Sequence, residues 1–246
     1  MRRPSMTRHE ESAPQSRPGA PTLLITAGPT QEPIDAVRYL GNRSSGRLGI
    51  ALAEAASAKG WRTILLLGPT PRRCEDTQVE VHRFRTTAEL GALLEAHWPE
   101  VDALVMAAAV ADFRPATTES GEEAGAIDPG EHKIRRRGGA LTIHLEPTPD
   151  LLARCAETRR PGQTIVGFAL EPRERMLESA RAKLERKGAD MIVANPLETM
   201  DAETIEATLV RRGGEEEQTP GAMGKGEFAE WLLERIAQES SERRRG

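Results

Sequence analysis

Short apolar runs alternate with helical patterns along most of this chain, and that alternation limits the possible folds more than any other feature. Each run is long enough to form one buried strand. The runs are TLLITAG (22–28), RTILLLGP (62–69), ALVMAAAVADF (103–113), TIVGFAL (164–170) and ADMIVANPL (189–197). Continuous apolar strands joined by helices are typical of a parallel sheet with helices on both faces. We therefore predict an α/β fold built on a doubly wound, Rossmann-like parallel sheet.

Two weaker strands and several helices complete the expected pattern. Residues 79–84 predict an edge strand, and residues 205–210 predict a further strand. Helices are expected at 47–60, 89–98, 150–160, 175–188 and 227–238. Thr86 opens a Thr-x-x-Glu capping box. Thr148 is the expected N-cap of its helix, with Pro149 at the first helical position.

One insertion interrupts the alternation of strands and helices. Residues 116–131 are acidic and rich in glycine, and residues 132–147 (HKIRRRGGALTIHLEP) predict a β-hairpin with a Gly-Gly turn. We expect this flap, about 116–147, to project from the sheet. The remaining boundaries predict a disordered leader at 1–21, one folded domain at 22–237 and a charged tail at 238–246.

Composition excludes several classes of function. The net charge is −4 and aromatic residues make up 3% of the chain, so neither a basic field nor a set of stacking side chains favours nucleic acid. No apolar run is long enough to cross a membrane. Cys74 and Cys155 are too few for a disulfide framework, which favours a reduced, cytoplasmic location. The histidines at 82, 97, 132 and 144 lack metal-ligand spacing, and we expect them to be structural or solvated.

In open α/β sheets, ligands bind outside the carboxyl ends of the strands. This rule directs attention to the residues that follow the apolar runs, which are AGPT, AVADFRP, the end of TIVGFAL, and ANPL. Asp112 and Asn195 lie there, and each could contact a ligand or merely form a turn before proline.

The loop NRSSGRLG (42–49) leads directly into a helix. Its backbone N–H groups, two hydroxyls and the positive end of the helix dipole could hold a phosphate, with Gly46 allowing close approach. Alternatively, Ser44 or Ser45 only caps the helix. The loop is not a P-loop, and no Gly-x-Gly-x-x-Gly follows the first strand, which disfavours a nicotinamide cofactor.

Two groups of cations could contact a polyanion. Lys133, Arg135 and Arg137 would share one face of a flap strand, and Lys183 and Lys187 would share one face of a helix. Taken alone, each group could equally be a solvated charged face.

Together and in this order, these motifs resemble phosphopantothenate–cysteine ligase, the C-terminal half of the bifunctional coenzyme A biosynthesis flavoprotein family. The resemblance covers about residues 22–237, the ligase domain. It is carried by residues 25–56, AAAVADFRPA (107–116), HKIRRR (132–137), PTPDLLA (147–153), TIVGFALE (164–171), residues 180–197 and GKGEFAEWLLERI (224–236).

The resemblance implies a ligase that joins 4′-phosphopantothenate and L-cysteine. The substrate carboxylate attacks the α-phosphate of CTP, pyrophosphate leaves, and an acyl-cytidylate forms. The cysteine amine then displaces CMP and leaves an amide. A carboxylate is a poor electrophile, so activation by phosphate supplies the leaving group. The resemblance also implies Mg²⁺ and a homodimer whose flap reaches the partner subunit.

Site residues follow from matching positions. Asn42 and Arg38 match the junction between nucleotide and substrate, and Lys133 matches a flap lysine that stabilises charge as the acyl-nucleotide forms. The residues matching nucleotide-binding or ligand-facing positions are Ser44, Ser45, Gly46, Ala108, Ala109, Asp112, Pro149, Asp150, Leu151, Phe168, Lys183 and Lys187. No metal ligands are assigned.

Some features depart from the family. Arg135 and Arg136 replace flap lysines, and Gly28-Pro29-Thr30 replaces a common Gly-Gly-Thr. The flavin-dependent decarboxylase half has no counterpart here, so we expect no flavin and a separate decarboxylase downstream in the pathway. Two alternatives stay open, an NADP-dependent oxidoreductase and a catalytically inactive nucleotide-binding relative.

Overall fold

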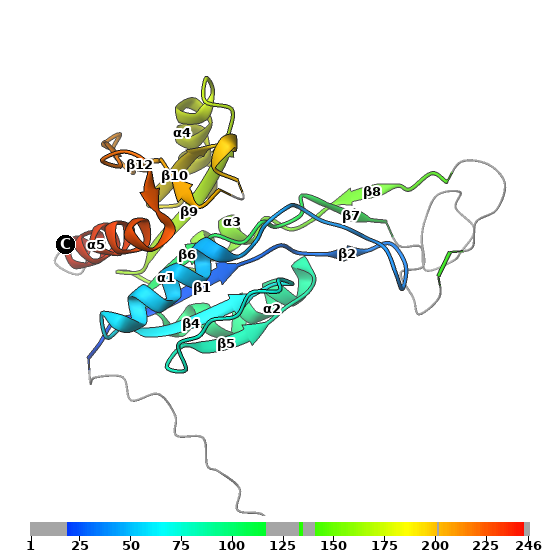
Figure 1. Ribbon diagram of the computed structural model, residues 1–246, viewed down its shortest axis with the longest axis horizontal. Helices are drawn as coiled ribbons and strands as arrows, with labels where there is room; N and C mark the ends of the chain where they lie inside the picture. Colours follow the sequence, from blue (N-terminus) through cyan, green and yellow to red (C-terminus); the bar gives the residue numbers. More distant parts are fainter. Residues whose placement is uncertain (1–18, 117–132, 135–140, 201, 244–246) are drawn as a thin grey trace, which may run out of the picture.

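The computed structural model describes residues 19–116, 133–134, 141–200 and 202–243. Within these ranges an eight-stranded sheet forms the centre of the molecule (Figure 1), in the order β13-β12-β10-β9-β6-β1-β4-β5. Its strands are β1 (Thr22–Ala27), β4 (Arg62–Leu67), β5 (Glu80–Arg83), β6 (Ala103–Met106), β9 (Thr164–Glu171), β10 (Met191–Pro196), β12 (Thr208–Arg211) and β13 (Glu216–Gln218). The six neighbouring strands β5, β4, β1, β6, β9 and β10 are parallel to one another. β12 pairs antiparallel with β10, and β13 pairs antiparallel with β12.

The order of strands confirms the doubly wound arrangement. From β1 the chain first builds outward through β4 to β5, then returns to β6 and builds the other way through β9 and β10. The direction therefore reverses between β1 and β6, where a doubly wound sheet opens a crevice at its carboxyl edge.

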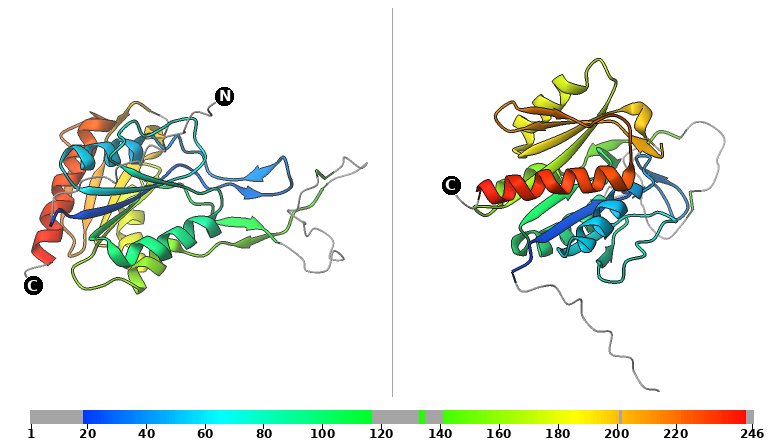
Figure 2. Two further views of the ribbon diagram at one scale, coloured as in Figure 1. Left: turned by 90° about the horizontal axis from the view of Figure 1, so that it is seen from below. Right: turned by 60° about the vertical axis from the view of Figure 1, so that its left-hand side comes forward.

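Helices cover both faces of the sheet (Figure 2). α1 (Arg47–Ala58) and α5 (Lys225–Arg243) pack on one face, and α2 (Thr87–His97), α3 (Leu151–Glu157) and α4 (Met176–Lys187) pack on the other. Strand β1 shows why both faces are apolar, because Leu23 and Ile25 join the first core and Leu24 joins the second. Successive side chains of a strand point to opposite faces, so a central strand needs a continuous apolar run.

Two short ribbons project beyond the carboxyl edge of the sheet (Figure 1). One pairs β2 (Glu32–Pro33) with β3 (Tyr39–Leu40), and the other pairs β7 (Phe113–Pro115) with β8 (Leu145–Pro147). We call these two ribbons, with residues 133–134, the arm. A further small ribbon pairs β11 (Thr204–Ile205) with β14 (Met223–Gly224), and single turns of 3-10 helix follow α2 and β10 at Trp98–Glu100 and Leu197–Thr199.

The predicted flap hairpin is wrong in its described part. Residues 141–144 are not in a strand, and β8 pairs with β7 rather than with a KIRR strand. Residues 117–132 and 135–140 lie outside the described ranges, and with them most of the acidic loop and Arg135, Arg136 and Arg137.

Several predicted boundaries also change. The strand predicted at 103–113 ends at Met106, and the one at 205–210 is divided between β11 and β12. Asp150, not Thr148, caps α3, because its Oδ1 atom accepts a hydrogen bond from the Ala153 N–H at 3.1 Å. Thr86 caps α2 as predicted.

The expectation of a charged tail from residue 238 is wrong up to Arg243, because α5 continues to that residue. The Arg243 guanidinium bonds Asp190, a fully buried carboxylate that also pairs with Arg159 and Arg212. These charges therefore fasten the last turn of α5 to the rest of the domain. Among the described helices, none is both long and apolar enough to span a membrane.

Candidate active site

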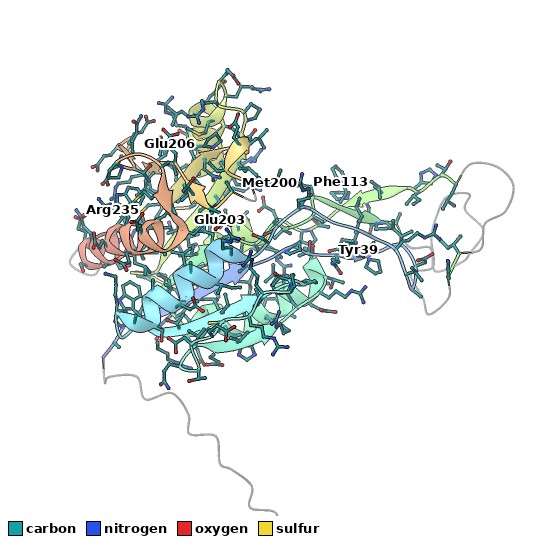
Figure 3. All side chains as sticks on the ribbon, in the orientation of Figure 1. Tyr39, Phe113, Met200, Glu203, Glu206 and Arg235 are labelled. Carbon is teal, nitrogen blue, oxygen red and sulfur yellow. The ribbon has the colours of Figure 1, made fainter. Side chains whose placement is uncertain are left out.

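A cleft of about 890 Å³ opens at the carboxyl edge of the sheet, where its direction reverses. Its walls come from segments distant in the sequence, namely residues 41–49, 106–112, 148–152 and 168–171, with α4 beside them. In Figure 3 the labelled Met200 and Glu203 lie near the start of α1, and Met200 lines the cleft. The end of β1 itself, AGPT, is not among the lining residues, whereas the other three strand ends singled out from the sequence are.

The loop before α1 leaves the start of that helix without a side-chain cap. Gly46 is the N-cap residue and has φ of 70°, a left-handed conformation that favours glycine. Ser44 does not cap α1, because its Oγ atom accepts from the Gly46 N–H at 3.3 Å instead. Ser44, Ser45 and Gly46 all line the cleft, so the open N–H groups of the first helical turn lie beside it. The alternative that Ser44 or Ser45 only caps this helix is therefore wrong.

Close packing brings this helix start to the end of β1. A Cβ atom added at Gly49 would collide with the Cβ atom of Ala27, the last residue of β1. Only glycine allows α1 to approach the sheet so closely. This contact places the first turn of α1 at the crevice.

Hydrogen bonds hold the opposite wall of the cleft against β1 and the residues that follow it. The Ala108 N–H donates to Thr26 Oγ1 at 3.1 Å, and the Ala111 N–H donates to Thr30 Oγ1 at 2.8 Å. Asn42 Nδ2 reaches across from the loop before α1 and donates to the Val110 carbonyl at 2.8 Å. The two loops therefore form one connected rim.

Two lysines on α4 form the cationic side of the cleft. Lys183 Nζ donates a hydrogen bond to the Phe168 carbonyl at 2.5 Å. The pKa of Lys183 is lowered mainly by burial and secondly by the positive charge of Lys187. Lys187 forms an ion pair with Asp150. Although burial opposes it, the hydrogen bond from Lys187 lowers the pKa of Asp150.

The charges of the cleft favour an anionic ligand. Six of its lining residues are cationic and three are acidic; they are Arg43, Arg47, Lys183, Arg186, Lys187 and Lys225, and Asp112, Asp150 and Glu171. One of the acids is already paired with a lysine. This excess of positive charge, beside an uncapped helix start, suits the oxygens of a phosphate chain.

Arg38 and Lys133 do not line the cleft, unlike every other site residue expected from the sequence. Both belong to the arm. The buried Asp35 carboxylate binds the Arg38 guanidinium and also accepts from the Ile134 N–H at 3.0 Å, while Arg38 Nη2 donates to the Ile134 carbonyl at 3.2 Å. Arg38 thus lies next to the segment that carries Lys133, and both lie away from the lysines of α4.

A buried glutamate anchors the arm. Glu32, at the start of β2, accepts hydrogen bonds at 2.7 Å from both the N–H and the hydroxyl of Thr87, the first residue of α2. An anion at a helix N-terminus is stabilised by the unpaired N–H groups there. The base of the arm is therefore fixed to the start of α2.

Sequence reasoning missed several lining residues. Arg47 begins α1 and forms an ion pair with Glu203, and Lys225 begins α5. Arg47 follows the SSG loop directly, which is a signal that could have found it. Lys225 carried no such signal, because only the fold brings α5 to the cleft.

Carboxylates of the cleft could hold a magnesium ion. Asp112 and Glu171 line the cleft, and Glu171 Oε1 also accepts from the Ser179 hydroxyl at 2.9 Å. Mg²⁺ prefers oxygen ligands and usually takes one or two carboxylates together with phosphate oxygens. The donor set of the cleft therefore fits that ion.

Comparisons with known proteins agree with this architecture. A cysteine/cysteine sulfinic acid decarboxylase from an unknown prokaryotic organism is 38% identical over 218 residues, 87% of this chain and 57% of the relative. The coenzyme A biosynthesis bifunctional protein CoaBC of Mycobacterium bovis is 41% identical over 181 residues, 70% of this chain and 41% of the relative. The chain thus spans about half the length of these relatives.

A solved structure matches over nearly its whole length. The crystal structure of the C-terminal domain of CoaBC superposes with a TM-score of 0.72 at 32% identity, covering 90% of this chain and 96% of that one. The family described as the DNA/pantothenate metabolism flavoprotein C-terminal domain matches residues 20–240. The chain therefore belongs to that family, which confirms the resemblance found in its sequence.

Proposed function

We propose that this protein joins 4′-phosphopantothenate and L-cysteine at the expense of CTP, a step of coenzyme A biosynthesis. The observation that carries the proposal is the cleft, in which the SSG loop, Asp112, Phe168, Lys183 and Lys187 meet at one edge of the sheet. Each lies at a position that the family resemblance assigns to nucleotide. The similarity to the C-terminal domain of CoaBC supports the same activity.

The reaction proceeds in two displacements. The phosphopantothenate carboxylate attacks the α-phosphorus of CTP. The bond between that phosphorus and the oxygen bridging to the β-phosphorus breaks, and pyrophosphate leaves. The cysteine amine then attacks the acyl carbon of the acyl-cytidylate, CMP leaves, and the amine loses its proton as the amide forms. In this scheme the uncapped start of α1 and the two lysines neutralise phosphate charge and hold the reactants in line.

Magnesium is the ion we propose for this cleft. Asp112 and Glu171 would hold it together with phosphate oxygens, and it would supply further neutralisation of phosphate charge. The assignment of CTP rather than ATP rests on the family resemblance.

We also propose that two copies of the chain pair through their arms. Val37, Tyr39, Phe113, Leu141 and Leu145 are large apolar side chains that are exposed in one chain. Figure 3 shows Tyr39 and Phe113 on the arm, away from α5. Exposed apolar side chains gathered on one projection mark a protein contact. Pairing would bring Lys133 and Arg38 of one copy toward the cleft of the other and complete its site.

The activity is tested by measuring pyrophosphate release from CTP with phosphopantothenate and Mg²⁺, followed by amide formation on addition of cysteine. We expect release that depends on phosphopantothenate and is greater with CTP than with ATP. Lys133→Gln should abolish turnover, while the matched control Lys59→Gln, on the outer end of the α1–α5 face, should keep it. Absence of release with every nucleotide would contradict the proposal.

The pairing is tested by sedimentation of the double variant Tyr39→Glu, Phe113→Glu. We expect the native chain to sediment as a dimer and the variant as a folded monomer with little turnover. A native chain that stays monomeric at the concentrations used for the assay would refute the arm contact without touching the assignment of the cleft.

A further inference from the structure

Two histidines and a glutamate gather at the outer edge of the sheet, outside the cleft. They are Glu80 and His82 of β5 and His97 of α2. β5 is the last strand of the sheet on its side, and none of the three residues lines the cleft. β1 and β4 lie between β6 and β5, so the cluster is set apart from the cleft across the sheet rather than along the strands.

The periodicity of each element explains why these side chains meet. Glu80 and His82 alternate with exposed residues and share a face with Phe84, which belongs to the core beneath α2. His97 follows Leu90 and Leu94 at helical spacing, and both leucines join that same core. The three polar residues therefore continue the apolar interface between α2 and the sheet to the point where solvent enters it.

Their ligand atoms are close enough to share one ion. One nitrogen of each ring and one carboxylate oxygen all lie within 4.8 Å of one another. His82 Nε2 lies 2.7 Å from Glu80 Oε1, and the two imidazole rings are 4.5 Å apart at their centroids and inclined by 44°. Because the rings are not stacked, their nitrogens can point toward a common centre.

We propose that Glu80, His82 and His97 form a binding site for a transition-metal dication, with zinc as the ion that best suits two imidazoles and one carboxylate. A site with three protein ligands leaves a fourth position for water. Partial exposure of Glu80 and His82, each 34%, provides access for it. Mg²⁺ and Ca²⁺ are excluded as preferred ions because they select oxygen ligands.

The surroundings are compatible with a bound cation. Arg62 lies 3.6 Å from Glu80 Oε2, the oxygen that does not face His82, so Glu80 can pair with Arg62 and still offer Oε1. Glu100 adds negative charge near His97. β5 is an edge strand, and its short ladder with β4 holds it on one side only. A bound ion would also attach β5 to α2.

The test is calorimetric titration of the complete, tag-free chain with zinc chloride, repeated with His82→Ala, His97→Ala and Glu80→Gln. The matched control is His144→Ala, an exposed histidine outside the cluster. We expect one tight site per native chain and per control chain, with affinity at least tenfold weaker in each of the three variants. Cobalt should give the absorption bands of a four-coordinate site in the native chain and lose them in the variants.

Thermal unfolding supplies a second measurement. Zinc in excess should raise the melting temperature of the native chain and of His144→Ala, but not of the double variant His82→Ala, His97→Ala. If a histidine variant fails to fold, Glu80→Gln keeps the shape of its side chain and carries the test. Absence of saturable binding, or equal binding by the double variant, would overturn the proposal. Ligase activity is measured separately, so its loss or presence does not decide this site.

Discussion

The Nζ atom of Lys183 lies 2.5 Å from the carbonyl oxygen of Phe168 and donates a hydrogen bond to it, joining α4 to β9 inside the cleft. This ammonium is largely removed from water, and burial lowers its pKa. A charge kept in that state without a full counterion destabilises the fold but is available to an anionic ligand. The arrangement suggests a group held ready for phosphate.

Lys183→Met should therefore separate binding from stability. Nucleotide affinity should fall by about tenfold or more, the usual worth of a hydrogen bond from a charged donor. The free energy of unfolding without ligand should rise, because the buried charge is gone. Isothermal titration and urea unfolding measure the two effects. Arg181→Met, on the same helix but paired with Glu216 away from the cleft, should change nucleotide affinity little.

The depressed pKa of Lys183 also predicts a pH dependence. A lysine whose folded pKa lies below its unfolded value costs stability while it is protonated in both states. As pH rises above the folded value, the folded state releases its proton first, so the native chain should gain stability that Lys183→Met does not gain. Equal slopes of stability against pH in the two proteins would contradict this reading.

Asp150 should stabilise the domain chiefly as the cap of α3. Asp150→Ala should cost about 1 kcal/mol of unfolding free energy, and Asp150→Asn should recover most of it because asparagine caps a helix equally well. Thr86→Ala, which removes the cap of α2, provides a control of the same kind. If asparagine proves as costly as alanine, the ion pair with Lys187 is the stabilising contact instead.

Asp35 should keep its contacts with Arg38 and Ile134 within the arm through mildly acidic conditions. The hydrogen bond from Arg38 places the pKa of Asp35 far below its ordinary value. A carboxylate with a lowered folded pKa contributes stability that is complete above its unfolded value, about pH 4, and is lost as pH falls through the folded value. An NMR titration of the Asp35 carboxyl carbon should show no midpoint near pH 4 in the native chain, and Arg38→Ala should move the midpoint upward. A native midpoint at the ordinary value would rule out a stable ion pair between Asp35 and Arg38.

Arg243 should stabilise the folded domain although it lies at the end of a long polar helix. Removing it by Arg243→Ala takes one of three cations from the buried Asp190 and should cost about 1–2 kcal/mol. Arg173→Ala removes an exposed pair with Glu206 and should cost less than about 1 kcal/mol. Chemical denaturation measures the unfolding free energy of both variants. Equal losses would mean that the buried pair of Arg243 with Asp190 stabilises the fold no more than an exposed ion pair does.

The sheet was predictable because its strands carry their own signal. β1, β4, β9 and β10 are buried on both faces, so each appears in the sequence as an unbroken apolar run. β7 and β8 lack that signal, because three residues of an exposed ribbon need no periodic burial. The error at 103–113 has the opposite cause, because the apolar loop that follows β6 and lines the cleft resembles a continuation of the strand in the sequence.

The cleft was predictable in part. Strand ends and the SSG loop located Asp112, Phe168 and Gly46, because parallel strands deliver their carboxyl ends to one edge. The sequence placed Lys133 on a projecting flap, but spacing could not indicate that Arg38 lies beside that segment on the arm, nor that Lys225 enters the cleft with α5. The sequence showed no metal-ligand spacing for His82 and His97 for a related reason, since their proximity arises from a strand edge and a helix end rather than from a local motif.

The last described turn of α5 has a consequence for how the domain is completed during synthesis. Asp190 emerges from the ribosome well before Arg243, so a growing chain must carry a carboxylate whose final counterion has not yet been made. Until α5 packs on the domain, Asp190 has Arg159 and Arg212 as its described counterions. Docking of α5, which follows every strand of the sheet in the sequence, therefore completes the charge balance beside β10.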